Sequence, residues 1–279
     1  MSHFSWENEW RLQNLKEESF LVRHVMDKTP KWVRFVEKKV PETLQNTLET
    51  AFNKAFVAVF ENGAGIIEKT YQKDSQIRQY QSNRRKLYYD GFSGKSVRRF
   101  EKQAKKTVSK NLVIASVEGI GFGLVGWGIP DIPIFVSVLL KSIYEIAISF
   151  GYSYTSDKEK LFILKVIDAA LKSGDVLRDK DQDINRLIHR YYDEETMPDE
   201  VGETDPFVVE LQIIRQIDFT AQALSRELLY GKFVQGTTFV GVVGGTADIT
   251  CLKRITEYAT LKYKRRFLLR QMPEEDDSE

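Results

Sequence analysis

Four carboxylates associated with two glycine-rich apolar runs are the residues best suited to chemistry. Asp131 and Glu145 follow the first run, and Asp248 and Glu257 follow the second. A carboxylate buried among apolar groups has a raised pKa and can act as a general acid or base. Each also has a structural role, because the aspartates suit helix N-caps and each glutamate follows a lysine by four residues, Lys141 in the first case. We interpret all five as buried polar residues and assign no catalytic residue and no metal ligand.

Two glycine patterns partly match nucleotide-binding motifs. Residues 121–126 spell G-x-G-x-x-G, but Gly128 and Pro130 lie where the helix of a dinucleotide-binding unit must run. Residues 94–96 spell Gly-Lys-Ser, yet a P-loop needs glycine five residues earlier, where this chain has Tyr89. We interpret both patterns as structural and expect no cofactor.

The histidines and the cysteine give no pattern of a metal or nucleophilic site. His3, His24 and His189 are scattered, and His189 is expected on a helix surface. Cys251 lies among apolar residues and is expected to be a small core residue. A single cysteine excludes an internal disulfide framework and fits a reducing compartment.

Basic residues gather in two clusters that border the apolar runs. Residues 95–110 contain seven lysines and arginines against Glu101 alone, and a second cluster covers residues 262–270. A charge run is commonly a solvated face, but cations beside apolar segments also suit anionic lipid headgroups, at about 1 kcal/mol for each charge. The headgroup candidates are Lys102, Lys105, Lys106, Arg265 and Arg266. Nucleic acid is not expected, because aromatic residues are not interleaved with these lysines and the net charge is only +1.

The glycine-rich runs, within residues 112–150 and 233–251, are unusual for helical sequence. An interior glycine costs a helix roughly 1 kcal/mol relative to alanine, so a dense run needs close helix packing or bilayer burial to offset it. We therefore expect two closely packed hairpins that are partly inserted in a membrane. The insertion candidates are Gly119, Gly121, Gly123, Gly126, Trp127, Gly241 and Gly245.

Residues 132–150 predict an apolar helix that Asp131 caps and Gly151 ends. Its polar residues form one narrow stripe, so the helix must be surrounded rather than lie on a surface. Its length of about 28 Å approaches the roughly 30 Å of bilayer hydrocarbon. Lys141 and Glu145 near its middle make a simple lipid-facing span costly.

The rest of the chain also has helical periodicity. Residues 41–62 predict one helix, and Ser156 with Glu159 forms a capping box before another that stops at Gly174. Residues 206–230 predict a third, with an inward stripe of Leu211, Ile214, Ile217, Leu224 and Leu228 and a stop at Gly231. We expect an all-α fold, a multi-helix bundle forming one domain over residues 1–272, with a disordered acidic tail at 273–279.

Two blocks resemble the EcsC family of bacterial proteins. The first is GIGFGLVGWGIPDIPIFVSVLLKSIYEIAISFGY, with a glycine run followed by D-x-P, an apolar helix and E-x-A. The second is VGVVGGTADITCLKRITEYATLKYKRRFL. The resemblance implies a helical protein on the cytoplasmic side of the membrane, in a family without an established activity. The family's namesake is encoded beside an ABC transporter, which implies a link to membrane transport but transfers no catalytic residue.

The functional expectation is a non-enzymatic protein at the cytoplasmic face of a membrane, linked to transport or membrane homeostasis. Its expected partners are anionic lipids and a membrane protein. The N-terminus lacks the basic start and apolar run of a signal peptide, which favours a cytoplasmic, peripheral location. Two alternatives remain open: a soluble helical protein-interaction module, and a hydrolase that uses the four carboxylates.

Overall fold

The computed structural model describes residues 3–25, 41–62, 67–68, 71–122, 132–197, 205–234 and 245–273. Within these ranges there are nine α-helices and no strand, which confirms the all-α prediction. The helices are α1 (His3–Val25), α3 (Glu42–Asn62), α5 (Lys73–Asp90), α6 (Gly94–Phe122), α7 (Ile132–Ser149), α8 (Asp157–Ala170), α9 (Gly174–Thr196), α11 (Pro206–Val234) and α12 (Gly245–Leu269).

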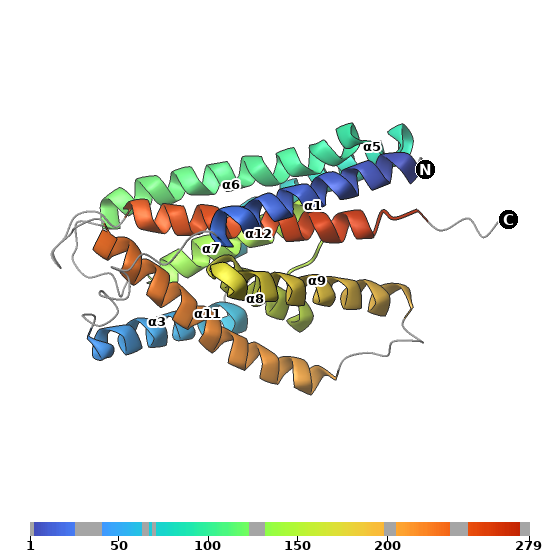
Figure 1. Ribbon diagram of the computed structural model, residues 1–279. Helices are drawn as coiled ribbons and strands as arrows, with labels where there is room; N and C mark the ends of the chain where they lie inside the picture. The colour runs from blue at the N-terminus through green and yellow to red at the C-terminus, as the bar shows by residue number, and fades with distance from the viewer. Residues whose placement is uncertain are drawn as a thin grey trace.

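The bundle is elongated, and α12 runs along its middle. Figure 1 shows α1, α6 and α12 extending along the same direction, with α3 and α11 on the opposite side of the molecule. Helix α12 packs against α1, α6, α7, α8 and α9, while α11 packs mainly on α3 and α8. A continuous apolar core joins the described helices. The last long helix of the chain therefore contacts helices from nearly its whole length.

Helix α7 is a core helix of this bundle. Twelve of its residues are buried, and it packs against α3, α5, α6 and α12. Among the described residues it is the one helix long and apolar enough to cross a bilayer. Two thirds of it is buried by protein, so its apolar composition is explained by the core. The prediction that this segment is surrounded is confirmed.

Local sequence signals set several helix ends as predicted. Gly151 ends α7 with a φ of +85°, a conformation that L-residues with a side chain rarely adopt. The Ser156 hydroxyl accepts a hydrogen bond from the backbone N–H of Glu159 at 3.3 Å and so caps α8. The helix predicted over residues 41–62 is observed as α3, and its side chains Phe52, Phe56 and Val59 are buried.

The predictions for α11 are partly wrong. The helix continues past Gly231 to Val234, and Leu211 and Ile214 are 51% and 56% exposed. Ile217 and Leu224 are buried as predicted. Figure 1 shows the N-terminal half of α11 extending beyond α3 to the edge of the bundle. Val209 and Ile217 of this half are buried, so Leu211 and Ile214 lie on the face of the helix that points away from the bundle.

The described residues in and before the two nucleotide-like motifs are mainly helical. Residues 112–117, which would be the strand of a dinucleotide-binding unit, lie inside α6. The Gly-Lys-Ser sequence forms the first turn of α6, where the backbone N–H of Ser96 donates to the hydroxyl of Ser93 at 3.3 Å. The Gly-Lys-Ser sequence is therefore structural, as predicted, whereas residues 123–126 of the other motif lie outside the described residues.

Substituting Gly151 with alanine is expected to destabilise the protein by more than the backbone conformation alone costs. A Cβ there would overlap the Tyr80 ring, whereas Gly174, also at positive φ, has open space around it. We expect Gly174→Ala to lower the free energy of unfolding by about 1 kcal/mol, and Gly151→Ala by about 1–3 kcal/mol more. Urea unfolding measures both.

A Tyr80→Ala background provides the control for this overlap. Removing the ring should bring the cost of Gly151→Ala close to that of Gly174→Ala. Equal costs for the two alanine variants in the native background would contradict the steric explanation.

Candidate functional site

Most of the second basic cluster lies inside the bundle, on α12, and only Arg270 beyond the end of this helix is exposed. The Lys262 ammonium is fully buried, 2.7 Å from a carboxylate oxygen of Glu17 on α1 and 2.7 Å from one of Asp181 on α9. The Lys264 ammonium is 2.6 Å from a carboxylate oxygen of Glu101 on α6. A buried charge needs such a partner, because leaving water without one costs several kcal/mol. These two lysines therefore join three other helices to α12.

Arg266 is a third buried cation of the cluster. One of its guanidinium nitrogens donates to both oxygens of Glu159 on α8, at 2.8 and 2.9 Å. The guanidinium stacks on Tyr152 and Phe162, 4.0 and 4.4 Å from their ring centroids. Burial raises the pKa of the neighbouring Tyr263 hydroxyl, with a further contribution from Glu159, so this hydroxyl stays protonated and donates to the carboxylate.

Arg265 also faces protein rather than solvent. Its side chain is 12% exposed, contacts Glu17 at 3.2 Å and lies 4.6 Å from the ring centroid of Trp10. A lipid headgroup would have to displace the carboxylates that hold Arg265 and Arg266. The structure therefore corrects the prediction that these two arginines contact lipid, because their positive charge is already neutralised inside the bundle.

Glu145 lies in a buried polar cluster between α5, α6 and α7. The amide of Asn111 donates to one carboxylate oxygen, and the amide of Gln76 lies 3.4 Å from the other. Burial raises the pKa of Glu145, while the Asn111 hydrogen bond and the charges of Lys141 and Lys110 oppose that shift. Glu145 is thus buried as predicted, but amides rather than Lys141 are its hydrogen-bond partners here.

Of the other predicted buried acids, only Glu257 has a described side chain, and it does not join Glu145. Glu257 is 39% exposed and pairs with Arg23 of α1 at 2.6 Å, so the prediction that it is buried and pairs with a lysine of its own helix is wrong. Asp131 and the side chain of Asp248 lie outside the described residues. Among the described residues, no group of three or more metal-ligating side chains is present.

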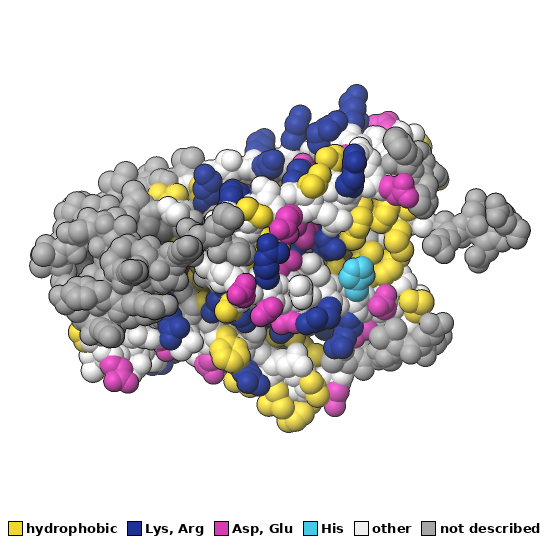
Figure 2. Space-filling model, in the orientation of Figure 1, with side chains coloured by type: hydrophobic (Ala, Val, Ile, Leu, Met, Phe, Trp, Pro, Cys, Tyr) yellow, Lys and Arg dark blue, Asp and Glu magenta, His cyan; other side chains and the backbone are white. Residues whose placement is uncertain are grey.

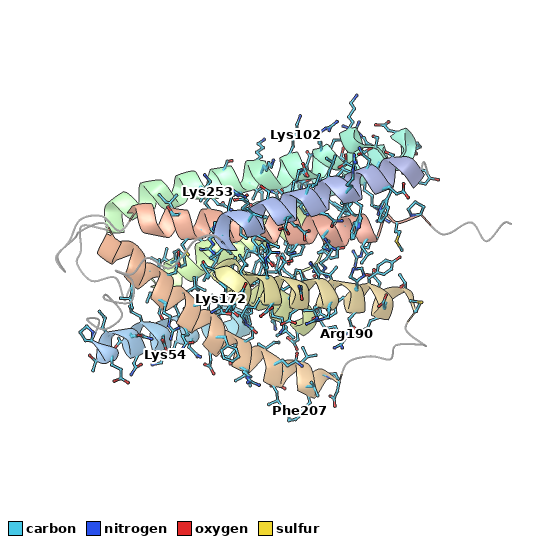
Figure 3. The ribbon with its side chains drawn as sticks, viewed as in Figure 1. Lys54, Lys102, Lys172, Arg190, Phe207 and Lys253 are labelled. Atoms are coloured by element: carbon cyan, nitrogen blue, oxygen red, sulfur yellow. The ribbon has the colours of Figure 1, made fainter. Side chains whose placement is uncertain are left out.

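The first basic cluster, by contrast, lies on the surface. On α6 the exposed cations recur at helical spacing and form one stripe: Lys95, Arg98, Lys102, Lys105, Lys106 and Lys110. The stripe spans about 22 Å of helix. Figure 2 shows Lys and Arg side chains along this edge of the molecule, and Figure 3 shows Lys102 pointing outward from α6. Within the described chain, no carboxylate lies within ion-pair distance of Lys102, Lys105 or Lys106.

Helix α5 extends this surface, which the sequence analysis did not anticipate. It adds the exposed cations Arg78, Arg84, Arg85 and Lys86. Its exposed acids are Asp74 and Asp90, and Asp90 is neutralised by Arg99 at 2.7 Å. The run Arg-Arg-Lys was visible in the sequence, but its position beside α6 was not. We call the exposed cations of these two helices the α5–α6 basic surface.

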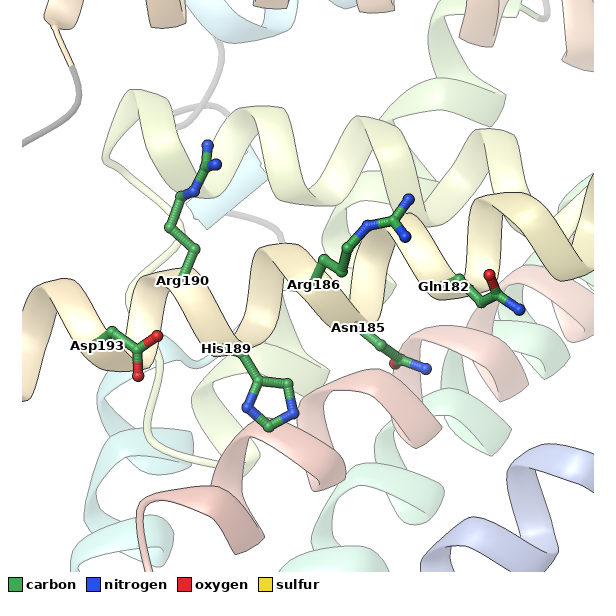
Figure 4. Close-up of a pocket in the computed structure, with 6 residues that line it drawn as sticks. All are labelled: Gln182, Asn185, Arg186, His189, Arg190 and Asp193. Atoms are coloured by element: carbon green, nitrogen blue, oxygen red, sulfur yellow. The ribbon is translucent and has the colours of Figure 1, made fainter. Parts of the chain in front are cut away.

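A groove of about 580 Å³ runs along α9. Its described lining comes from one helix: Gln182, Asn185, Arg186, His189, Arg190 and Asp193. Figure 4 shows the two arginines directed to one side and Asn185 and His189 to the other. The groove thus brings two arginines close to the imidazole of His189 on an open surface. Its described lining contains no nucleophilic side chain and does not enclose a ligand. His189 is exposed and Cys251 buried, as predicted.

The glycine candidates fall mostly outside the described residues. Gly119 and Gly121 lie in the last turns of α6, and Gly245 begins α12. Gly123, Gly126, Trp127 and Gly241 are not described. The helix ends that border both glycine-rich segments, in α6, α7, α11 and α12, lie at the same end of the bundle (Figure 1).

Comparison with known proteins supports the resemblance seen in the two sequence blocks. The sequence model of the EcsC protein family matches residues 7–268, which include every described helix at least in part. The chain belongs to the EcsC family. No solved structure is similar enough to count as a match.

Two curated relatives come from Bacillus subtilis strain 168. The chain is 27% identical to Protein EcsC over 169 residues, which cover 60% of this chain and 61% of that protein. It is 30% identical to the uncharacterized protein YdbA over 165 residues, or 57% and 55% of the two chains. The similarity thus spans less than two thirds of each relative.

Removing the positive charge of Arg266 should destabilise this EcsC-family chain strongly. In Arg266→Met the Glu159 carboxylate would remain buried without its cation. Breaking such a pair from one side costs about 3–5 kcal/mol, so thermal and urea unfolding should show a large loss. Arg266→Met combined with Glu159→Gln should recover part of it, because no buried charge is then left unpaired.

Arg270→Met is the matched control. Its pair with Glu195 is exposed, at 35% and 52% for the two side chains, so the loss should stay below about 1 kcal/mol. Similar losses for both methionine variants would contradict the structural role of Arg266.

The buried Glu145 should make stability depend on pH in a definite direction. Its pKa is raised in the folded state, so the unfolded chain loses this proton at a lower pH. Folding therefore loses stability from this group as pH rises above its ordinary pKa of 4.5. The neutral variant Glu145→Gln lacks this effect. We expect its unfolding free energy, relative to the native protein, to increase with pH in urea titrations, and a constant difference would refute the assignment.

Proposed function

We propose that this protein is a non-enzymatic helical protein that associates peripherally with the cytoplasmic face of a membrane through its α5–α6 basic surface. The observation that supports this most directly is the stripe of exposed cations on α6, for which the described structure provides no carboxylate partners around Lys102, Lys105 and Lys106. The opposite face of the same helix is buried, at Val97, Phe100 and Ala104. The helix is thus anchored in the bundle and presents its charge outward.

Anionic lipid suits the shape and charge of this surface. Each lysine or arginine near an anionic leaflet contributes about 1 kcal/mol, and the attraction decays within a Debye length of about 8 Å at physiological salt. A straight stripe of about 22 Å lets several cations reach one flat surface together. Such binding is reversible and falls with added salt, which is typical of a peripheral protein.

The packing of α7 bears on which apolar segments can enter a bilayer in this proposal. Helix α7 contacts four other helices, so inserting it into lipid would expose the core faces of those helices to water. We therefore propose contact along the bundle surface and no membrane span by α7. Any insertion by the glycine-rich segments would occur from the end of the bundle where their bordering helices meet, close to the C-terminal end of α6.

A soluble protein-interaction module is the second candidate function. Exposed apolar side chains on α11 favour it, with Phe207, Leu211 and Ile214 each more than half exposed. Figure 3 shows Phe207 at the far side of the molecule from Lys102. The two functions are compatible, because a protein bound to lipid through α6 leaves this half of α11 accessible to a protein partner.

Reversing charge on the α6 stripe should abolish lipid binding. We expect Lys102→Glu/Lys105→Glu/Lys106→Glu to bind vesicles of phosphatidylcholine and phosphatidylglycerol on the order of a hundredfold more weakly than the native protein, since three favourable charges become repulsive. Co-sedimentation over a range of salt concentrations measures this. The variant should fold normally, because all three side chains are exposed.

The control carries the same change in net charge elsewhere. Lys54→Glu/Arg190→Glu/Arg226→Glu alters exposed cations on α3, α9 and α11 and should retain most of the binding. Equal losses in the two triple variants would indicate attraction by net charge alone. A native protein that ignores anionic vesicles at low salt would refute the membrane proposal and favour the interaction module.

A further inference from the structure

Two adjacent tyrosines stand out from the bundle at the end of α5. Tyr88 is 83% exposed and Tyr89 is 80% exposed, the highest values among the large hydrophobic residues of the described chain. Their rings contact each other edge to face, with centroids 5.4 Å apart, and neither hydroxyl has a hydrogen-bond partner among the described residues. They contribute nothing evident to the core.

These tyrosines sit at the tip of the α5–α6 basic surface. Residues three or four positions apart on a helix are neighbours, so Tyr88 lies next to Arg84 and Arg85, and Tyr89 next to Arg85 and Lys86. Helix α6 begins only a few residues later, with Lys95 exposed in its first turn. The pair is therefore an apolar protrusion surrounded by cations.

A single exposed aromatic residue is ordinary on a protein surface, but this combination has a specific physical use. The ring of tyrosine is apolar and its hydroxyl is polar, so the side chain is stable at the boundary between headgroups and acyl chains. Neighbouring arginines and lysines can bind phosphate while their aliphatic stems accompany the rings into that boundary. Electrostatic attraction brings the tip to the surface, and ring burial then holds it there.

We infer that Tyr88 and Tyr89 insert into the headgroup–acyl boundary of an anionic bilayer and fix the orientation of the protein on it. The inference rests on the proposed function and adds the residues that penetrate and the direction in which the molecule lies. The α5–α6 turn is the point of deepest contact, and the stripe of α6 lies along the headgroups. The exposed half of α11 then faces away from the lipid.

The geometry favours lipid over nucleic acid. Proteins that bind single strands provide a basic groove that follows the backbone, with aromatic faces on which bases stack. Here the tyrosines protrude from the end of a helix, and the cations lie on the outward surface of two packed helices. A protrusion of this kind matches a deformable, planar layer of anionic headgroups.

The test is vesicle binding by Tyr88→Ser/Tyr89→Ser. Losing the partial burial of two rings should weaken binding to mixed phosphatidylcholine and phosphatidylglycerol vesicles by about tenfold. At about 0.5 M salt, where screening suppresses the electrostatic part, the native protein should keep a bound fraction that this variant lacks. Tyr88→Trp/Tyr89→Trp should retain that fraction, since tryptophan also favours the interface.

Phe207→Ser/Phe219→Ser is the matched control, because it removes two exposed aromatic rings from α11. We expect it to bind vesicles like the native protein, and thermal unfolding should show that both serine pairs fold. Native-like vesicle binding by the tyrosine variant, with loss in the α6 triple variant, would overturn the inference and leave the proposed function standing. No vesicle binding by the native protein would overturn both. Tyrosine-dependent binding to single-stranded nucleic acid, without binding to vesicles, would identify a different partner and also overturn it.

Discussion

The requirement that a buried charge have a partner organises this bundle around α12. Lys262, Lys264 and Arg266 enter the interior from one helix, and each is neutralised by a carboxylate from another element. Apolar packing would hold these helices together in many rotations about their axes. The ion pairs favour one rotation, since a turn of α12 by one residue would bury cations against apolar side chains at a cost of several kcal/mol.

Lysine and arginine serve two purposes in this chain, and the degree of burial of the side chain distinguishes the two. The cations of α12 are structural, whereas those of α6 remain in solvent and are available to a partner. Sequence alone did not make this distinction, because the carboxylates that neutralise α12 lie far away along the chain, at Glu17 and Glu159 for example. In the sequence, the basic runs of α6 and α12 have the same appearance, since each borders an apolar segment. Only the positions of the neighbouring helices show which run is buried.

Features decided by local chemistry were predictable, and features decided by distant neighbours were not. Gly151 and Ser156 end and begin helices through their own backbone conformation or hydroxyl, and the sequence identified both. The burial of α7 followed from its nearly continuous apolar composition. Leu211 was misplaced because α11 carries apolar residues on more than one side, and the neighbouring helices cover the side that holds Val209 and Ile217. The exposed tip of α5 was missed because its exposure also depends on where the neighbouring helices lie.

Helix α12 follows the other described helices in the sequence, and this order affects how the bundle forms. The N-terminal helix contributes Glu17 and the Trp6 indole, which donates to the carbonyl of Leu268 at 2.7 Å, so the first and last helices depend on each other. Synthesis runs from the N-terminus, so α12 leaves the ribosome after the other described helices. Until then Glu17 and Glu159 in the earlier helices lack the α12 cations that neutralise them, and the core cannot close. The described bundle can therefore finish folding only after α12 has been synthesised, and a chain truncated before α12 would lack the charges that bring its helices together.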